Sequence, residues 1–402
     1  MTDQPRFLQI HTLTPYIGVL LNRDDVGQAK RLPLGGATRG RVSSQCLKRH
    51  WRRATGEWSL GELGDLAVRS RVTFAREVAE PLQAEGLDAG KVATAVAALQ
   101  AALLGESKKA AAKKKADDQA VDLQTNQVIV LGRAEIDYVK TLVRRLVENT
   151  PPADKLKAAV DELTKQEKPN FASMRESAGL DAALFGRMIT GDILARSDAA
   201  VHVAHAFTVH ALEAEPDYFT AVDDLTADAG EQGSGHINVS ELTSGLYYSY
   251  VVVDLPLLVS NLEGCEQKAW AQADRTLAGK VVERLIGLVA TVSPGAKLGS
   301  TAPYGFADTV LVEAGNRQPR SLANAFYKPV PARNDLREQG TERLLKQLGC
   351  FDRMYGGGEA RRLATLIDDG VALGGIERLS LGQIAAWAGG IAAGVAAPSG
   401  AG

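Results

Sequence analysis

The sequence predicts an α+β fold whose core has the strand and helix order βαββαβ. Four segments have the alternation, or the β-branched and aromatic content, that is typical of strands, and two helical patterns lie between them. Two long insertions interrupt this order, one mostly helical and one rich in polar residues. Without the insertions, the order is that of the ferredoxin-like arrangement.

The first strand and the first helix lie within the N-terminal 60 residues. Residues 7–13 (FLQIHTL) alternate and are predicted to form a strand. Glycines between residues 35 and 40 follow, and we expect them to let the backbone approach a ligand closely. Ser43 and Ser44 are favourable N-cap residues before SQCLKRHWRRAT, which contains neither Gly nor Pro and is therefore predicted to be a helix.

Residues 60–200 form the first insertion and are mostly helical in pattern. An Ala-rich apolar segment at 91–104 and a segment with helical spacing at 138–147 are predicted helices. Between them, SKKAAAKKKADD at 107–118 is a low-complexity segment with five lysines. Two interpretations stay open for it, a contact with DNA or a solvated linker.

The second half of the sequence supplies the other three strands and the second helix. Residues 201–212 and 246–255 are predicted strands, and the polar segment between them is the second insertion. Residues 278–292 have an amphipathic helical pattern that a Pro-Gly pair ends, and the last strand is predicted at 308–314.

Residues 331–402 are predicted to form a C-terminal helical region with a flexible tail. The run Gly356–Gly358 and the small residues from 388 to 402 are the segments expected to be flexible.

The composition is that of an ordinary globular protein. Of 402 residues, 45% are hydrophobic and 23% charged, and no apolar run approaches the roughly 20 residues that span a bilayer. Cys46, Cys265 and Cys350 are scattered, so neither a disulfide framework nor a zinc motif is predicted. These features favour a cytoplasmic protein with no membrane partner.

A concentration of positive charge near the N-terminus is the main functional signal. The stretch from Leu21 to Arg53 holds nine basic and two acidic residues, a formal charge of +7, whereas the whole chain carries −2. On the predicted helix Gln45, Lys48 and Arg52 share one face, and the helix N-terminus suits a phosphate. A second, apolar face is expected to pack against the protein, and it consists of Leu47, Trp51 and Ala54. The pattern indicates either a phosphate-backbone contact or a solvated basic face.

Two groups of residues invite a metal-binding interpretation, and the sequence favours the alternative for each. Asp24 and Asp25 adjoin Arg23, and we expect them to neutralise nearby cations and to shape the loop. The histidines of HVAHAFTVH at 202–210 point to opposite faces of a strand or lie too far apart to chelate, so packed or hydrogen-bonded histidines are expected. No metal, cofactor or catalytic residue is predicted.

A series of motifs runs in order through most of residues 5–330. They are LNRDD, the GG pair and R-x-R-V-S-S-Q-x-L-K-R in the basic stretch, ALFGRM (183–188), HVAHAFTVH (202–210), DYFTAVDDL (217–225), SGLYYSYVVVDLPLLVSNL (244–262), PGAK (294–297) and LANAF (322–326). In this order the motifs resemble the CasC family, the backbone subunits of the type I-E CRISPR Cascade complex.

The resemblance implies an RRM-like palm, a helical fingers domain in the first insertion and a β-hairpin thumb in the second. The predicted segments are 1–60 (palm with the basic helix), 61–200 (fingers), 201–211 (palm strand), 212–245 (thumb), 246–330 (palm) and 331–402 (C-terminal region). The aromatic RNP1 sequence of simple RNA-recognition motifs is absent, so bases are not expected to stack on the sheet in the common way.

The function that the resemblance implies is that of a CRISPR RNA-binding subunit without catalysis. Copies of the chain would polymerise along the guide RNA as a helical filament, join other Cascade subunits, and present the guide for pairing with target DNA in antiviral defence. Two alternatives stay open. One is a type III-like, metal-dependent RNA endonuclease that uses Asp24 or Asp25, and the other is an RNA-binding protein outside CRISPR defence.

The resemblance also assigns candidate residues. The RNA-binding candidates are Arg23, Lys30, Ser43, Gln45, Lys48, Arg52, Met188 and Lys297. Phe219 and Ile237 are candidate thumb residues. For Met188, a wedge against a base and simple core packing both stay open.

Overall fold

The computed structural model describes residues 4–105, 122–149, 155–174, 178–187, 194, 197–222, 234–332, 334–367 and 374–395. The chain divides into two compact units. The sheet unit comprises Met1–Ser59, His202–Leu255 and Ala278–Gly402, and the helical unit comprises Leu60–Val201 and Pro256–Leu277. Residues 256–277 were predicted to belong with the second palm segment, but they pack with the helical insertion.

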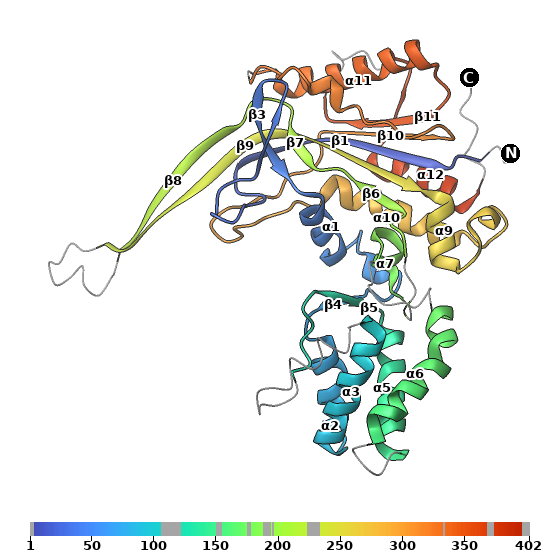
Figure 1. Cartoon of the computed structure of the whole chain (residues 1–402). Helices are drawn as coiled ribbons and strands as arrows, with labels where there is room; N and C mark the ends of the chain where they lie inside the picture. The colour runs from blue at the N-terminus through green and yellow to red at the C-terminus, as the bar shows by residue number, and fades with distance from the viewer. Residues whose placement is uncertain are drawn as a thin grey trace. The chain divides into compact units, whose positions relative to one another are not determined.

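A mixed β-sheet forms the centre of the sheet unit (Figure 1). In spatial order its strands are β12 (Glu377–Arg378), β11 (Ala360–Thr365), β10 (Thr309–Gly315), β1 (Phe7–Val19), β9 (Ser234–Asp254), β7 (Ala206–Thr208), β3 (Ala37–Val42) and β2 (Arg31–Leu34). Two further strands, β6 (Val201–Val203) and β8 (Glu213–Val222), also pair with β9.

Four central strands and two helices have the order that periodicity predicted. The strands β10, β1, β9 and β7 are neighbours in that order, and each adjacent pair is antiparallel. Helix α1 (Ser44–Arg53) lies between β1 and β7 in the sequence, and α10 (Thr276–Thr291) lies between β9 and β10. Each helix therefore connects two strands that have one antiparallel strand between them, which is a split βαβ unit.

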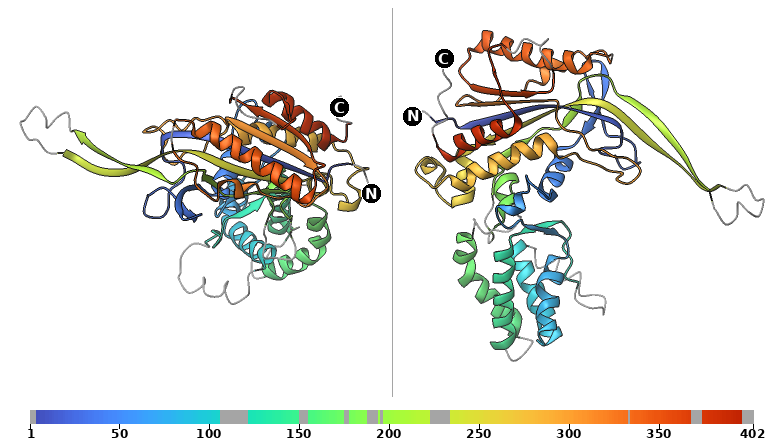
Figure 2. Two further views of the ribbon diagram at one scale, coloured as in Figure 1. Left: turned by 90° about the horizontal axis from the view of Figure 1, so that it is seen from above. Right: turned by 180° about the vertical axis from the view of Figure 1, so that it is seen from behind.

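Both faces of the sheet are covered. Figures 1 and 2 show α11 (Leu336–Tyr355) on one face and α10 and α12 (Leu381–Ala393) on the other. The face under α11 carries a core cluster that includes Leu13, Tyr248 and Phe326. Tyr248 is only 1% exposed, so this aromatic side chain is not available for stacking on a base.

The second insertion forms an antiparallel hairpin. Strands β8 and β9 pair from Glu213↔Ser244 to Val222↔Ser234, and Figure 1 shows them leaving the sheet as a two-stranded ribbon. The same β9 continues into the sheet, where it pairs with β1 as far as Phe7↔Asp254. In the hairpin register Phe219 lies opposite Asn238 and Ile237 lies opposite Thr220.

The helical unit packs short and long helices around its own core. Its elements are η1 (Leu60–Glu62), β4 (Val68–Ser70), η2 (Phe74–Ala79), α2 (Glu80–Ala84), α3 (Ala89–Leu104), β5 (Ile129–Leu131), α5 (Arg133–Asn149), α6 (Leu156–Ser173), α7 (Leu180–Phe185), α9 (Leu255–Glu263) and η5 (Gln267–Ala269). Leu99, Leu142 and Phe171 are fully buried at its centre. No helix among the described residues is both long enough and apolar enough to cross a bilayer.

Gly35 and Gly40 allow close contacts within the protein, whereas a Cβ on Gly36 would meet no atom within 4 Å, so the close approach of a ligand to these glycines stays a prediction. Gly35 and Gly36 form the turn of the β2–β3 hairpin with φ values of +61° and +77°. A Cβ on Gly35 would lie 1.5 Å from the carbonyl oxygen of Tyr327. A Cβ on Gly40 would lie 2.9 Å from the Tyr247 hydroxyl.

The C-terminal region is less helical and better anchored than predicted. It contains α11 and α12, but also β11 and β12, and β11 extends the sheet beyond β10. The short helix η6 (Ala323–Phe326) precedes this region. The Gly357 carbonyl accepts a hydrogen bond of 2.7 Å from Arg317, and Ala388 of α12 is fully buried. Flexibility was therefore wrongly predicted for 356–358 and for the α12 part of the tail. The segments 107–118 and 396–402 lie outside the described residues.

Candidate nucleic-acid interface

Helix α1 begins where the two serines predicted it. Ser43 is the N-cap, and its hydroxyl accepts a 3.3 Å hydrogen bond from the Cys46 amide. The Ser44 amide donates to Nδ1 of His205 at 3.0 Å. The amides of Ser44 and Cys46 thus have acceptors within the protein. Of the first three backbone amides of α1, which lies in the described part of the chain, only that of Gln45 is left for an external acceptor.

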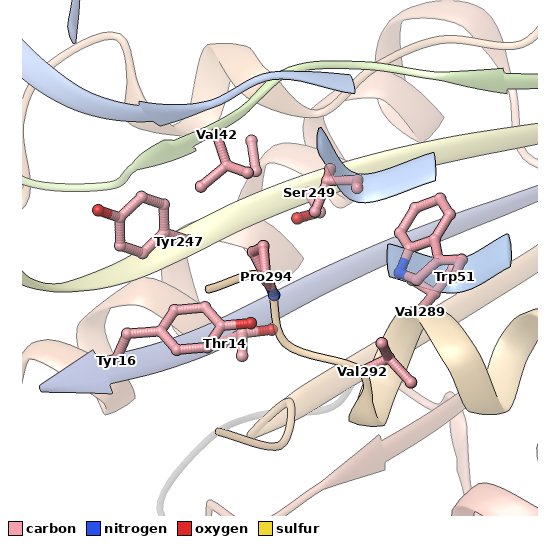
Figure 3. Close-up of a pocket in the computed structure, with 11 residues that line it drawn as sticks. Thr14, Tyr16, Val42, Trp51, Tyr247, Ser249, Val289, Val292 and Pro294 are labelled. Atoms are coloured by element: carbon pink, nitrogen blue, oxygen red, sulfur yellow. The ribbon is translucent and has the colours of Figure 1, made fainter. Parts of the chain in front are cut away.

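The apolar side of α1 fixes the helix on the sheet. Leu47 and Trp51, which were predicted to pack, are 6% and 1% exposed. Figure 3 shows Trp51 close to Val289 of α10, and the sheet residues Thr14 and Ser249 line the same small cavity. The closed space between them is about 10 Å³, which holds no more than one water molecule. The opposite side of the helix is thus held in a defined orientation.

An open groove of about 430 Å³ lies beside the N-terminus of α1. Three segments form it: the loop after β1, the helix itself, and the loop after α10. The lining residues are Leu21, Asn22, Arg23, Ser43, Gln45, Cys46, Arg49, His50, Gly295 and Ala296. Of the predicted RNA-binding residues, Arg23, Ser43 and Gln45 meet here.

Arg49 is the arginine of α1 that lines the groove, and it was not among the RNA-binding residues predicted from the sequence. Arg49 is exposed, whereas Lys48 and Arg52 are half-buried and lie outside the lining. At about 100° per residue, Arg49 points away from the buried pair Leu47 and Trp51. The spacing of that apolar pair was the signal that would have identified it.

Further cations gather around the first turn of α1. Burial lowers the pKa of His205, and the nearby charges of Arg41 and Lys30 lower it further. Burial raises the pKa of the Cys46 thiol, while Arg49 and Lys30 act in the opposite direction. Lys30, Arg41 and Arg49 therefore act together on groups of this turn, and their field favours an anion.

The loop between β1 and β2 presents Arg23 at the edge of the groove. The Asn22 side-chain oxygen accepts from the Ser43 amide at 2.9 Å, which fixes the start of the loop. The Asp24 carboxylate accepts from the amides of Val26 (3.1 Å) and Gln28 (2.9 Å). Asp24 thus shapes the loop, as expected, and Arg23 itself is exposed.

Not all of the +7 charge is available to a ligand. Arg39 is fully buried and donates to the carbonyl oxygens of Thr208 (3.0 Å) and Phe326 (2.9 Å). Arg31 forms an ion pair with Glu241 of β9. Both side chains bind groups of the protein itself, so the formal charge of +7 overstates the positive charge that is available to a ligand.

The remaining candidates have other surroundings. Lys297 donates to the Ser240 hydroxyl at 2.8 Å, and Met188 lies outside the described residues. His210 is hydrogen-bonded as predicted, because its Nδ1 donates to the Ala211 carbonyl and its Nε2 accepts from the Leu246 amide. Within the described ranges, no group of three or more His, Cys, Asp or Glu residues is arranged to hold a metal ion.

Comparisons with known proteins connect this chain with CRISPR-associated proteins. The Cas family model described as CT1975-like protein matches residues 8–385. A chain of a "CRISPR RNA-guided surveillance complex, pre-nicking" is 27% identical, with a TM-score of 0.74, over 95% of this chain and all of that chain. A chain of another "CRISPR RNA-guided surveillance complex" is 23% identical, with a TM-score of 0.64 and coverages of 94% and 99%, and shows the fold alone. No curated protein matches this sequence significantly.

Proposed function

This chain belongs to the CT1975-like Cas family, and from that premise we propose that it is a CRISPR RNA-binding backbone subunit of a Cascade-type surveillance complex. The type I-E assignment, as a CasC-like subunit, rests on the motifs in residues 5–330. The observation that carries the proposal is the groove beside α1, where exposed Arg23, Gln45 and Arg49 surround an available helix amide.

The fold supports the same proposal. The strand order β10-β1-β9-β7 with α1 and α10 is consistent with an RRM-like palm. The helical unit corresponds to the fingers, and the β8–β9 hairpin corresponds to the thumb. Because both faces of the sheet are covered, the guide would bind at the edge of the palm, along α1 and the β1–β2 loop.

The groove chemistry favours recognition of the RNA backbone. Guanidinium groups, an amide side chain and a helix amide bind phosphate and sugar oxygens of any sequence. The bases would stay free to pair with target DNA, so pairing supplies the specificity. Copies aligned head to tail along one guide would form an open helical filament in the cytoplasm, together with other Cascade subunits.

We further propose that the chain has no catalytic activity of its own. In the type III-like alternative, Asp24 or Asp25 would bind a metal ion and the chain would cut RNA. The Asp24 carboxylate already accepts two backbone amides of its loop, which competes with such a role.

The RNA that accompanies the purified protein tests the proposal directly. The protein should be expressed with a CRISPR array and its partner subunits, and the recovered RNA should be sequenced. We expect guides with uniform repeat-derived ends. A heterogeneous mixture of cellular RNA would instead favour an RNA-binding protein outside CRISPR defence, and the absence of RNA would contradict the proposal.

A further inference from the structure

Two adjacent residues of β9, at the base of the hairpin, contact the two segments that flank α1 in the groove. The Glu241 carboxylate accepts the Ala29 amide at 2.7 Å and also pairs with Arg31. The hydroxyl of Ser240 accepts from Lys297 at 2.8 Å. Ala29 lies near the end of the β1–β2 loop, and Arg31 is the first residue of β2. Lys297 follows directly after Gly295 and Ala296, which line the groove.

These contacts hold in place the two loops that form the groove together with α1, namely the loop after β1 and the loop after α10. The β1–β2 loop is fixed at its start, where Asn22 binds the Ser43 amide, and Glu241 fixes its other end. The Ala296 amide donates to the Leu20 carbonyl at 2.9 Å, and Lys297 adds the connection to β9. Neighbouring strand residues point to opposite faces, so Ser240 and Glu241 can each hold a different wall.

We propose that Glu241 and Ser240 are positioning residues through which the base of the β8–β9 hairpin sets the geometry of the anion-binding groove. The proposal rests on the proposed function in taking RNA as the ligand of the groove. It also implies a coupling. A ligand in the groove and a partner on the hairpin act on the same short segment of β9, so each should change the affinity for the other by the same factor.

Removal of the negative charge of Glu241 tests the proposal, because electrostatics and positioning predict opposite changes in RNA affinity. Glu241 is a carboxylate close to a groove for a polyanion, so electrostatics alone predicts tighter RNA binding when its charge is removed. The loss of an anchor for the loop that carries Arg23 and Lys30 predicts weaker binding.

The binding experiment compares Glu241→Ala with Glu241→Gln and Glu215→Ala in the full chain, with single-stranded RNA of mixed sequence. All three variants remove one negative charge, Gln keeps an acceptor for the Ala29 amide, and Glu215 is an exposed carboxylate on the facing strand β8. We expect Glu241→Ala to bind at least about fivefold more weakly, with an unchanged salt slope, and the other two to bind nearly as the parent does. Equal or tighter binding by Glu241→Ala would overturn the proposal.

Hydrogen exchange provides a measurement that needs no RNA. In Glu241→Ala the Ala29 amide should exchange faster than in the parent, and in Ser240→Ala the segment 294–297 should do so. Unchanged exchange at both places would refute the positioning role, whatever the RNA result. Faster exchange in a protein that binds no RNA would instead leave the positioning role standing and reject RNA as the ligand.

Discussion

Arg39 and Arg49 carry the same charge ten residues apart, and the fold gives them opposite roles. Arg39 is fully buried and donates to main-chain carbonyl oxygens, whereas Arg49 is exposed at the groove. A buried guanidinium without a carboxylate is retained only where several acceptors surround it. A charge count along the sequence therefore has to be corrected for each residue by tertiary structure.

Arg49→Ala should weaken the binding of single-stranded RNA to a similar degree for all sequences. Its loss removes one phosphate contact, so the log–log salt slope should fall by about 0.7. The slope is measured by titrating RNA at several salt concentrations. Arg53→Ala, which removes an exposed cation outside the groove lining, serves as the control.

The combined substitutions Lys48→Ala and Arg52→Ala test the helix face that the sequence predicts to bind RNA. If both side chains contact phosphates, the combined variant should lower the slope by about 1.4. If the salt slope is unchanged both in this variant and in Arg49→Ala, α1 does not belong to the RNA interface.

Glu313 makes the stability of the sheet unit depend on acid pH. Burial alone would raise the pKa of this carboxyl, but hydrogen bonds and charges from His11 and Arg320 hold its pKa well below the usual range. A depressed carboxyl pKa stabilises the fold above the unfolded value of about 4.3, and this stabilisation is lost as the pH falls below it. Burial also lowers the pKa of His11, so the fold favours the neutral imidazole. The unfolded chain takes up a proton on this group first, and folding stability therefore begins to fall below about pH 6.5.

Thermal unfolding between pH 7 and pH 3 tests this assignment. Glu313→Gln should be less stable at pH 7 by on the order of 3 kcal/mol, because Arg320 and Arg361 lose their buried partner. Its unfolding temperature should also fall less steeply than that of the parent below pH 4.5. Glu342→Gln on α11, an exposed position, should follow the parent curve, and a Glu313→Gln curve parallel to the parent would contradict the assignment.

At the scale of elements, the sequence predicted those whose signals are local. The caps and apolar spacing of α1 and α10 and the residue content of β1 and β10 lie within each segment, and these elements appear where they were predicted. The short β2, β3, β11 and β12 were missed, because their strand character comes from pairing with distant segments. The predicted strand 201–212 divides into β6 and β7, with the Ala204 amide still bonded to the Tyr250 carbonyl.

In the candidate site, too, the features with local sequence signals were predicted, and those that depend on distant segments were missed. The N-cap at Ser43 and the apolar face of α1 were predicted, but the third wall at Gly295 and Ala296 comes from a segment about 250 residues away. Likewise, Glu241 and Ser240 act on the groove from the hairpin, and no local pattern connects them with it.

Two truncations of the hairpin should separate assembly from RNA binding. Removal of residues 217–239 shortens the ribbon but keeps Ser240 and Glu241, so the chain should bind RNA yet fail to form ordered polymers on a guide. Removal of 213–243 also takes away both positioning residues, so RNA binding should weaken as well. Size measurements of complexes on one long guide, with RNA titrations beside them, distinguish these results. Assembly of normal size by either truncation would show that the hairpin does not link the subunits.

At the scale of the whole molecule, the proposed binding of an anion in the groove does not by itself supply the groups that hydrolysis needs. Cleavage of a phosphodiester usually needs a metal clamp or a positioned acid–base pair. In the described part of the groove, the lining residues are cationic, neutral or apolar. The carboxylates next to them include Asp24 and Asp25 of the β1–β2 loop and Glu241, which accepts the Ala29 amide and pairs with Arg31. The Oδ1 atom of Asp24 accepts two amides of its loop, and Nδ1 of His205 accepts the Ser44 amide.

The purified protein should therefore protect bound RNA and should not cut it, with or without magnesium. The test incubates the protein with end-labelled guide RNA, alone and paired with a complementary RNA or DNA, and follows the fragments over time. Added ribonuclease should digest the bound guide more slowly than the free guide, because the phosphates in the groove are covered. Asp24→Asn and Asp25→Asn keep the size of each side chain and should leave protection unchanged. Magnesium-dependent cleavage that either variant abolishes would establish the endonuclease alternative, because a carboxylate that only shapes its loop cannot supply a metal site.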